Sequence, residues 1–98
     1  GNGGSESGPV VPSVGNRGTT VNLTITLDAD AGPPLPPVNA PINNVTVGSW
    51  TATSPVRVNT TTITATLVIP AGASTGSQDV VVTFNIPSYT LLNAFTIL

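Results

Sequence analysis

Residues 63–84, ITATLVIPAGASTGSQDVVVTF, constrain the fold of this 98-residue chain more than any other stretch. From residue 62 to residue 69, apolar side chains alternate with threonines or a valine. This period of two predicts a half-buried β-strand, because successive side chains of a strand point to opposite faces. Val80, Val82 and Phe84 repeat the pattern after a segment rich in proline, glycine and serine. Two such strands joined by turn residues predict neighbouring antiparallel strands of an all-β domain.

Further short strands are predicted on both sides of this pair. Thr19–Asp28 shows the cleanest alternation, whereas Pro9 and Pro12 make residues 9–14 more suitable for a sheet edge. No segment has a helical period. Seven short strands separated by turns predict an immunoglobulin-like antiparallel β-sandwich, here without a disulfide because the chain has no cysteine. The predicted strands are residues 9–14, 19–28, 45–47, 56–58, 63–69, 80–84 and 91–98.

The apolar face of these strands predicts the hydrophobic core, since the inward side of a sandwich strand takes every second residue. The side chains expected there are Val21, Leu23, Ile25, Val47, Ile63, Leu67, Ile69, Val80, Val82, Phe84, Phe95 and Ile97.

The residue inventory argues against several classes of function. The chain has neither cysteine nor histidine, so the usual zinc ligands, the usual general base and any Cys-His or Ser-His pair are missing. Arg17 and Arg57 are its only basic residues, which is too few for nucleic acid or an anionic membrane surface. No apolar run approaches the ~18 residues of a transmembrane helix. We therefore expect one domain that is not an enzyme, needs no cofactor and neither binds nucleic acid nor inserts into a membrane.

Four short motifs resemble those of a known family. They are PSVG at 12–15, VTVG at 45–48, IPAGASTG at 69–76 and FTI at 95–97. With them the chain resembles an IPT/TIG domain, an immunoglobulin-like (E-set type) module of plexins, certain transcription factors and many bacterial secreted proteins. The segment at 69–76 is the most specific part of the resemblance. In place of the family's Gly-x-x-Phe after the second strand, this chain has Leu-Asp-Ala-Asp and a proline-rich insertion.

The resemblance covers residues 9–98 and implies a non-catalytic structural or interaction module within a larger secreted or cell-surface protein. Residues 1–8, GNGGSESG, have the composition of a flexible linker. The implied partners are neighbouring domains of the same chain or another protein. Two alternatives are an accessory carbohydrate-binding module of an extracellular hydrolase and a self-assembling fibre or surface-layer subunit. In the fibre subunit, residues 1–14 would pair with a neighbour's sheet edge.

Asp28 and Asp30 are the only closely spaced carboxylates and the only metal ligands that the sequence suggests. A strand end beside an irregular loop offers carboxylate and carbonyl oxygens, the ligands that calcium takes. Calcium needs six to eight ligands, however, and only two are visible here. Two solvated acids that discourage edge pairing are the alternative that we favour.

The proline-rich segment 33–37, PPLPP, has two interpretations. It resembles the polyproline ligands of SH3 and WW domains, but no basic residue flanks it. The alternative, which we favour, is a stiffened connection between strands. Trp50 and Tyr89 are the only candidates for stacking on a sugar, and we expect them at opposite ends of the sandwich.

Sandwich topology places three segments at one end: residues 29–43, the turn near Asn59 and the loop that contains Tyr89. Rigid loops lose little entropy on association, and tyrosine offers contact area plus a hydroxyl group. We therefore expect Leu35 and Tyr89 to be exposed in one patch and to form the binding surface.

Overall fold

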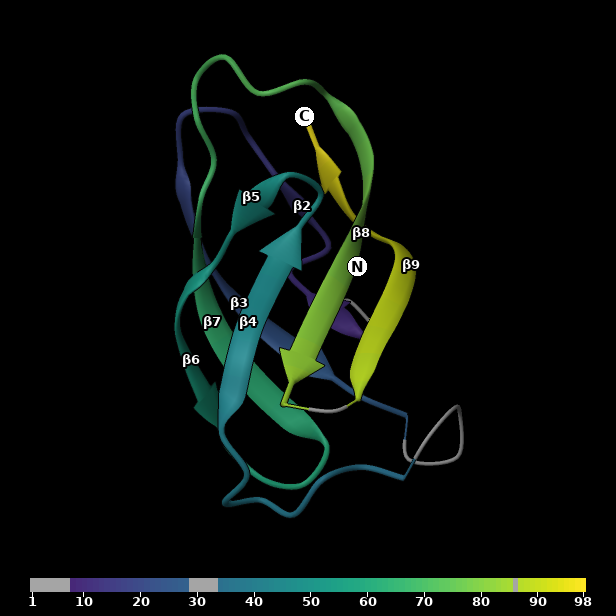
Figure 1. Cartoon of the computed structure of the whole chain (residues 1–98). Coiled ribbons are helices and arrows are strands. Elements are labelled where there is room, and N and C mark those ends of the chain that lie inside the picture. The colour runs from purple at the N-terminus through teal and green to yellow at the C-terminus, as the bar shows by residue number, and fades with distance from the viewer. Residues whose placement is uncertain (1–7, 29–33, 86) are drawn as a thin grey trace.

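The computed structural model describes residues 8–28, 34–85 and 87–98, which form nine β-strands in two sheets and no helix (Figure 1). In the figure, β4, β8 and β9 lie in front of β3 and β7. The strands are β1 (Val10–Val11), β2 (Val14–Gly15), β3 (Thr20–Thr26), β4 (Ile42–Val47), β5 (Trp50–Thr51), β6 (Thr53–Arg57), β7 (Thr62–Val68), β8 (Gly76–Phe84) and β9 (Ser88–Ile97).

The four-stranded sheet has the order β1-β3-β7-β6 and is antiparallel throughout. Its central pair, β3 and β7, is aligned without interruption from Thr20↔Val68 to Thr26↔Thr62. The alternation of the two sequences explains this register. With it, apolar residues of both strands face inward together, and a slip of one residue would invert both faces.

The five-stranded sheet has the order β2-β9-β8-β4-β5. Its strands are antiparallel except at one end, where β2 runs parallel to β9. The two sheets together form a sandwich-like arrangement, with the loop 34–41 at the end away from the C-terminus (Figure 1).

The first predicted strand divides between the two sheets. Residues 10 and 11 pair with β3, whereas residues 14 and 15 pair with β9. The break falls at Pro12, which follows a cis peptide bond. Because the chain keeps its direction while it changes partner, β2 meets β9 in parallel. The prediction of a wholly antiparallel sandwich was therefore wrong at this one pair.

The predicted core is buried, apart from Val21, which is partly buried and packs against it. Leu67 and Val82, one from each sheet, are almost completely shielded from solvent. Other apolar residues complete the core, namely Val10, Leu27, Val45, Ala52, Ala65, Ala73 and Tyr89.

Strand boundaries differ from the prediction where pairing outweighs local composition. β4 begins at Ile42, inside the proline-rich region, because Ile42 pairs with Phe84. β9 begins at Ser88, in the predicted loop before residue 91, because Ser88 pairs with Thr83. Trp50 starts a short strand, β5, instead of lying in a loop.

Candidate functional site

The polar side chains of one end of the sandwich converge on the loop between β3 and β4. We call this region the proline-loop end; it comprises residues 34–41, the β6–β7 turn at 58–61 and the first residues of β9. It lies at the bottom of Figure 1. Arg57 and Tyr89 hold its three parts together, as the contacts below show.

The guanidinium group of Arg57 donates four hydrogen bonds, all to backbone carbonyls. Nε bonds to Asn59 O at 3.0 Å, and Nη2 bonds to Thr60 O at 2.7 Å, both within the β6–β7 turn. Nη2 also bonds to Pro36 O at 2.8 Å, and Nη1 bonds to Pro37 O at 3.2 Å. The planar, multi-donor shape of the group lets one side chain fasten two segments at once.

Two aromatic rings, those of Phe84 and Tyr89, connect Arg57 and the loop to the core. Phe84 lies under the Arg57 guanidinium, whose carbon is 4.9 Å from the ring centroid, a cation–π geometry. Tyr89 meets Phe84 edge to face, with centroids 5.8 Å apart and an interplanar angle of 85°. The Tyr89 hydroxyl donates a 2.8 Å hydrogen bond to Pro34 O. The proline-rich loop is thus held through three of its backbone carbonyls, those of residues 34, 36 and 37.

These contacts correct the expected binding patch. Tyr89 is only 7% exposed, because its pairing with Val82 directs the ring inward against Phe84. Leu35 is partly buried and packs against the core. Leu35 and Tyr89 therefore do not form an exposed patch, although Tyr89 and the loop do lie at the same end.

The same contacts bear on the polyproline interpretation. SH3 and WW domains grip a preformed polyproline helix in an aromatic groove. Here the carbonyls of Pro34, Pro36 and Pro37 already accept hydrogen bonds from Tyr89 and Arg57. Residues 34–37 are thus held against the body of the domain by hydrogen bonds, which is consistent with the favoured interpretation of a stiffened connection.

Asn59 shapes the adjoining turn with its side chain. Its Oδ1 accepts hydrogen bonds from Thr61 N at 3.0 Å, Thr61 Oγ1 at 3.1 Å and Thr62 N at 3.0 Å. An asparagine that caps backbone N–H groups two and three residues ahead stabilises a tight turn. This turn places the Asn59 and Thr60 carbonyls where Arg57 donates hydrogen bonds to them.

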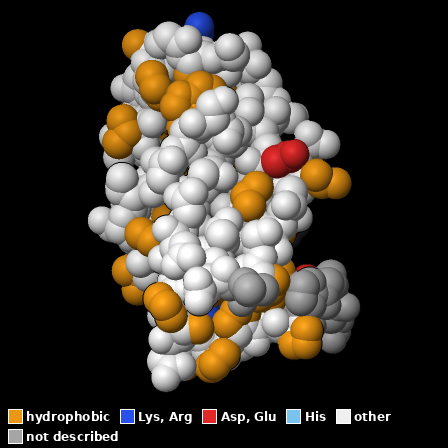
Figure 2. Space-filling model, in the orientation of Figure 1, with side chains coloured by type: hydrophobic (Ala, Val, Ile, Leu, Met, Phe, Trp, Pro, Cys, Tyr) orange, Lys and Arg blue, Asp and Glu red, His pale blue; other side chains and the backbone are white. Residues whose placement is uncertain are grey.

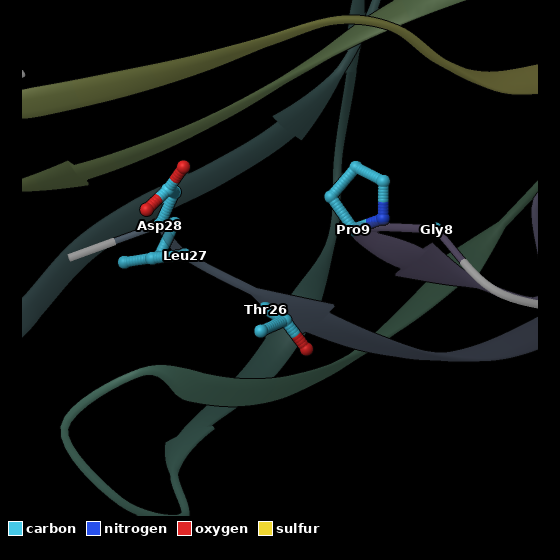
Figure 3. A pocket seen from close by; sticks show the side chains of 5 residues that line it. All are labelled: Gly8, Pro9, Thr26, Leu27 and Asp28. Carbon is cyan, nitrogen blue, oxygen red and sulfur yellow. The ribbon is translucent and has the colours of Figure 1, made fainter. Parts of the chain in front are cut away.

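The candidate calcium ligands are only partly within the described residues. Asp28 is exposed beyond the end of β3, and Asp30 lies outside the residues that the structure describes. Asp28 borders an open depression that Gly8, Pro9, Thr26 and Leu27 also line; Figure 3 shows Pro9 and Asp28 on two sides of it. Within residues 8–28, 34–85 and 87–98, no group of three or more Asp, Glu, His or Cys side chains comes together. Both interpretations of these carboxylates, the favoured solvated acids and the calcium ligands, stay predictions.

The four aromatic residues, all within the described part of the chain, do not provide a sugar-stacking platform. Phe84, Phe95 and Tyr89 are buried, and Trp50 is partly buried against the core. Trp50 lies on β5 and Tyr89 on β9, so β4 and β8 separate them. The two side chains therefore lie on strands that are not neighbours, and they do not share one platform.

Asp79 has a structural role that the sequence did not predict. Three residues of β9, 92–94, lie opposite Asp79 alone, because the register shifts between Gln78 and Val80. Asp79 Oδ1 accepts a 2.8 Å hydrogen bond from Asn93 N, and Asn93 has a positive φ of 51°. Arg57 was missed as well; the only signal available for it was that it is one of two basic residues in the chain.

None of the protein-family models, curated proteins or solved structures compared with the chain matches it. Across the described ranges, the chain forms no helix with the length and hydropathy needed to cross a membrane.

Proposed function

We propose that this chain is a non-catalytic, immunoglobulin-like module of IPT/TIG type, with a structural or interaction role in a secreted or cell-surface multidomain protein. The observation that carries the proposal is the strand order. If β1 and β2 are the halves of strand A, the four-stranded sheet reads A-B-E-D. The other sheet then reads A′-G-F-C-C′, with β5 as C′. Immunoglobulin domains have ABED in one sheet and C, F and G in the other, with C′ added in variable-type domains.

The segment with the most specific family resemblance supports the same proposal. Residues 70–73 form a turn in which Ala73 N donates to Pro70 O at 3.1 Å, and β8 begins three residues later, at Gly76. Gly76 has a φ of 124°, a conformation that favours glycine. The backbone conformation at this position therefore explains why the last residue of the motif, Gly76, is a glycine in this chain.

The use of the reactive and polar side chains also supports a structural role. Arg57, Tyr89, Asn59 and Asp79 each hold a loop, turn or bulge in place through the hydrogen bonds above. Figure 2 shows that charged side chains are few on the face of the five-stranded sheet. Such a surface suits a module that packs beside other domains, since interface centres are depleted of charge.

The two alternatives have less support. A carbohydrate-binding module commonly needs exposed aromatic rings, and here the rings serve the core. For a fibre formed by strand exchange, residues 10–11 and 14–15 would have to leave their own sheets. Residues 1–7, the rest of that expected pairing segment, lie outside the described residues.

Thermal unfolding with and without candidate ligands tests the proposal. We expect one cooperative transition, the same by far-UV circular dichroism and by the fluorescence of Trp50, as for a small single domain. Soluble polysaccharides should leave the Tm unchanged, because only a ligand that binds the folded state raises it. A saturable rise in Tm with one polysaccharide would instead favour the carbohydrate-binding alternative.

A further inference from the structure

Three Asn-x-Thr tripeptides occur in the chain, and each has the sequence that N-linked glycosylation requires. They begin at Asn22, Asn44 and Asn59. The first lies within β3 and the second within β4, whereas the third belongs to the turn that joins β6 to β7. All three asparagines are exposed, so exposure alone does not distinguish them.

The backbone around each tripeptide does distinguish them. In a strand, the Cα atoms of residues i and i+2 are about 6.6–6.8 Å apart, and pairing with neighbouring strands keeps this spacing. Asn22 Oδ1 accordingly accepts its hydrogen bond across the sheet, from Thr66 Oγ1 at 3.2 Å. The turn instead folds the third tripeptide on itself, so that Thr61 Oγ1 donates to Asn59 Oδ1 at 3.1 Å.

The contacts of the Asn59 amide suit bond formation at its nitrogen. Oδ1 accepts three hydrogen bonds, from Thr61 N, Thr61 Oγ1 and Thr62 N. Negative charge develops on an amide oxygen when the nitrogen loses a proton, and donors already placed there stabilise that charge. Within the described part of the chain, Nδ2 of this amide has no hydrogen-bond partner. It is therefore available to a reagent that approaches from solvent.

The proline-loop end also exposes apolar side chains that an attached oligosaccharide would cover. Val58, next to Asn59 in sequence, is 55% exposed, and Val38 in the proline-rich loop is 49% exposed. Arg57 bonds to both segments, so the two valines belong to the same end of the sandwich. Charged residues make up only 6% of the chain and give this end little solubility. A bulky, hydrophilic glycan would supply it.

We propose that Asn59 is a site of N-linked glycosylation, the one tripeptide of the three that the folded domain presents to an oligosaccharyltransferase. The inference rests on the proposed function, since a module of a secreted or cell-surface protein meets the enzymes that act during export. The donor is an oligosaccharide linked to a lipid through a diphosphate. Nδ2 forms a bond to the anomeric carbon of the first sugar, and the bond from that carbon to the diphosphate oxygen breaks. The diphosphate leaves with the electron pair, and the Nδ2 proton passes to a base of the transferase.

Transfer to the folded protein tests the site. The chain is produced without glycosylation, purified, and incubated with an oligosaccharyltransferase and a lipid-linked oligosaccharide. Peptide-N-glycosidase in water enriched in heavy oxygen then converts each modified asparagine into a labelled aspartate, which peptide mass spectrometry locates. We expect occupancy at Asn59 to exceed that at Asn22 or Asn44 by at least about tenfold, because a paired strand must first open locally and the turn need not. Equal occupancy at the three positions, or none at Asn59, would overturn the proposal.

Two controls separate the effect of the fold from that of local sequence. Short synthetic peptides that contain each tripeptide should accept the oligosaccharide to a similar extent, because none of them is held in a strand. If the peptides show the same preference as the folded protein, the fold does not select the site. Asn59→Asp keeps an acceptor oxygen for the N–H groups of residues 61 and 62 but has no Nδ2. This variant should retain the wild-type Tm and gain no oligosaccharide at residue 59.

The two proposals fail separately. Transfer by a purified enzyme requires no export, so it tests Asn59 alone, whereas the proposed function is tested by unfolding with candidate ligands. Absence of transfer at Asn59 would leave the structural module intact. A polysaccharide that raises the Tm of a chain still modified at Asn59 would instead overturn the proposed function and keep the site.

Discussion

At Gly15 the backbone of β2 lies directly against core side chains, one of them from the last strand, β9. A Cβ there would be 2.8 Å from Ile69 Cδ1, 2.8 Å from Phe95 Cζ and 3.0 Å from Val21 Cγ2. All three neighbours are core or core-packed side chains, so none can move freely. Glycine is required at this position by space, since its φ is not in the left-handed region.

Gly15→Ala should destabilise the protein by about 1–3 kcal/mol, as for other overpacked cores. Gly72→Ala is the matched control, because an added Cβ at Gly72 meets nothing within 4 Å. Urea unfolding followed by circular dichroism measures both changes. A Gly15→Ala variant as stable as the control would show that β2 can lift away from the core at little cost.

Arg57 contributes through the shape of its side chain. Its four hydrogen bonds end on neutral carbonyls in two segments, and its guanidinium covers Phe84. A lysine ammonium has three donors without the planar fork and cannot reproduce these contacts.

Arg57→Lys should therefore cost about 1.5–3 kcal/mol, the range for hydrogen bonds to a charged group. For a domain of this size, each kcal/mol lowers the Tm by about 4–8 °C. Arg17→Lys, at the exposed arginine, is the control and should leave the Tm unchanged. Faster proteolysis of residues 34–41 in Arg57→Lys would show that the loop has been released, whereas wild-type proteolysis would contradict the fastening role.

At the scale of elements, the sequence predicted what depends on alternation and missed what depends on pairing. β3, β7 and β8 were recognised because their inward residues recur with a period of two. The division of residues 9–14 between two sheets could not be inferred, since it depends on which strand lies beside each half. The exposure of Tyr89 was wrongly predicted for the same reason, because Val82 sets the direction of its ring.

The bulge in β9 is a second feature that pairing explains. Asp79 lies opposite residues 92–94, and its carboxylate satisfies the N–H of Asn93, which would otherwise have lost its ladder partner. Bulges of this kind are specified features of a sheet and change its local twist.

Asp79→Ala should lower stability by about 0.5–1.5 kcal/mol, the net value of one hydrogen bond. Asp79→Asn keeps an acceptor at Oδ1 and should stay close to wild type. Hydrogen exchange of the Asn93 amide, followed by NMR, reports on the bond directly and should accelerate in the alanine variant only. Equal exchange rates in the two variants would exclude Asp79 as the residue that holds the bulge.

At the scale of the whole molecule, the edge strands of the two sheets are protected against pairing with another chain. The end strands β1, β2 and β5 have two residues each, which is too short to template another chain. The fourth, β6, is longer but contains Pro55, a register shift and Ser54 with a φ of 52°. Proline, irregular register and short length are the devices by which natural sheets avoid edge-to-edge pairing.

We therefore expect the protein to be a monomer whose solubility depends on Pro55. Val56, within β6, and Val58, just after it, are both more than half exposed. Pro55→Val would restore an N–H and lengthen the apolar part of this edge, and both changes favour strand addition. Sedimentation velocity should show a monomer at all concentrations for the wild type and concentration-dependent association for Pro55→Val. Pro55→Lys is the control, because it also restores the N–H but places a charge on the edge, and it should stay monomeric. Association of the wild type itself would return the fibre subunit to consideration.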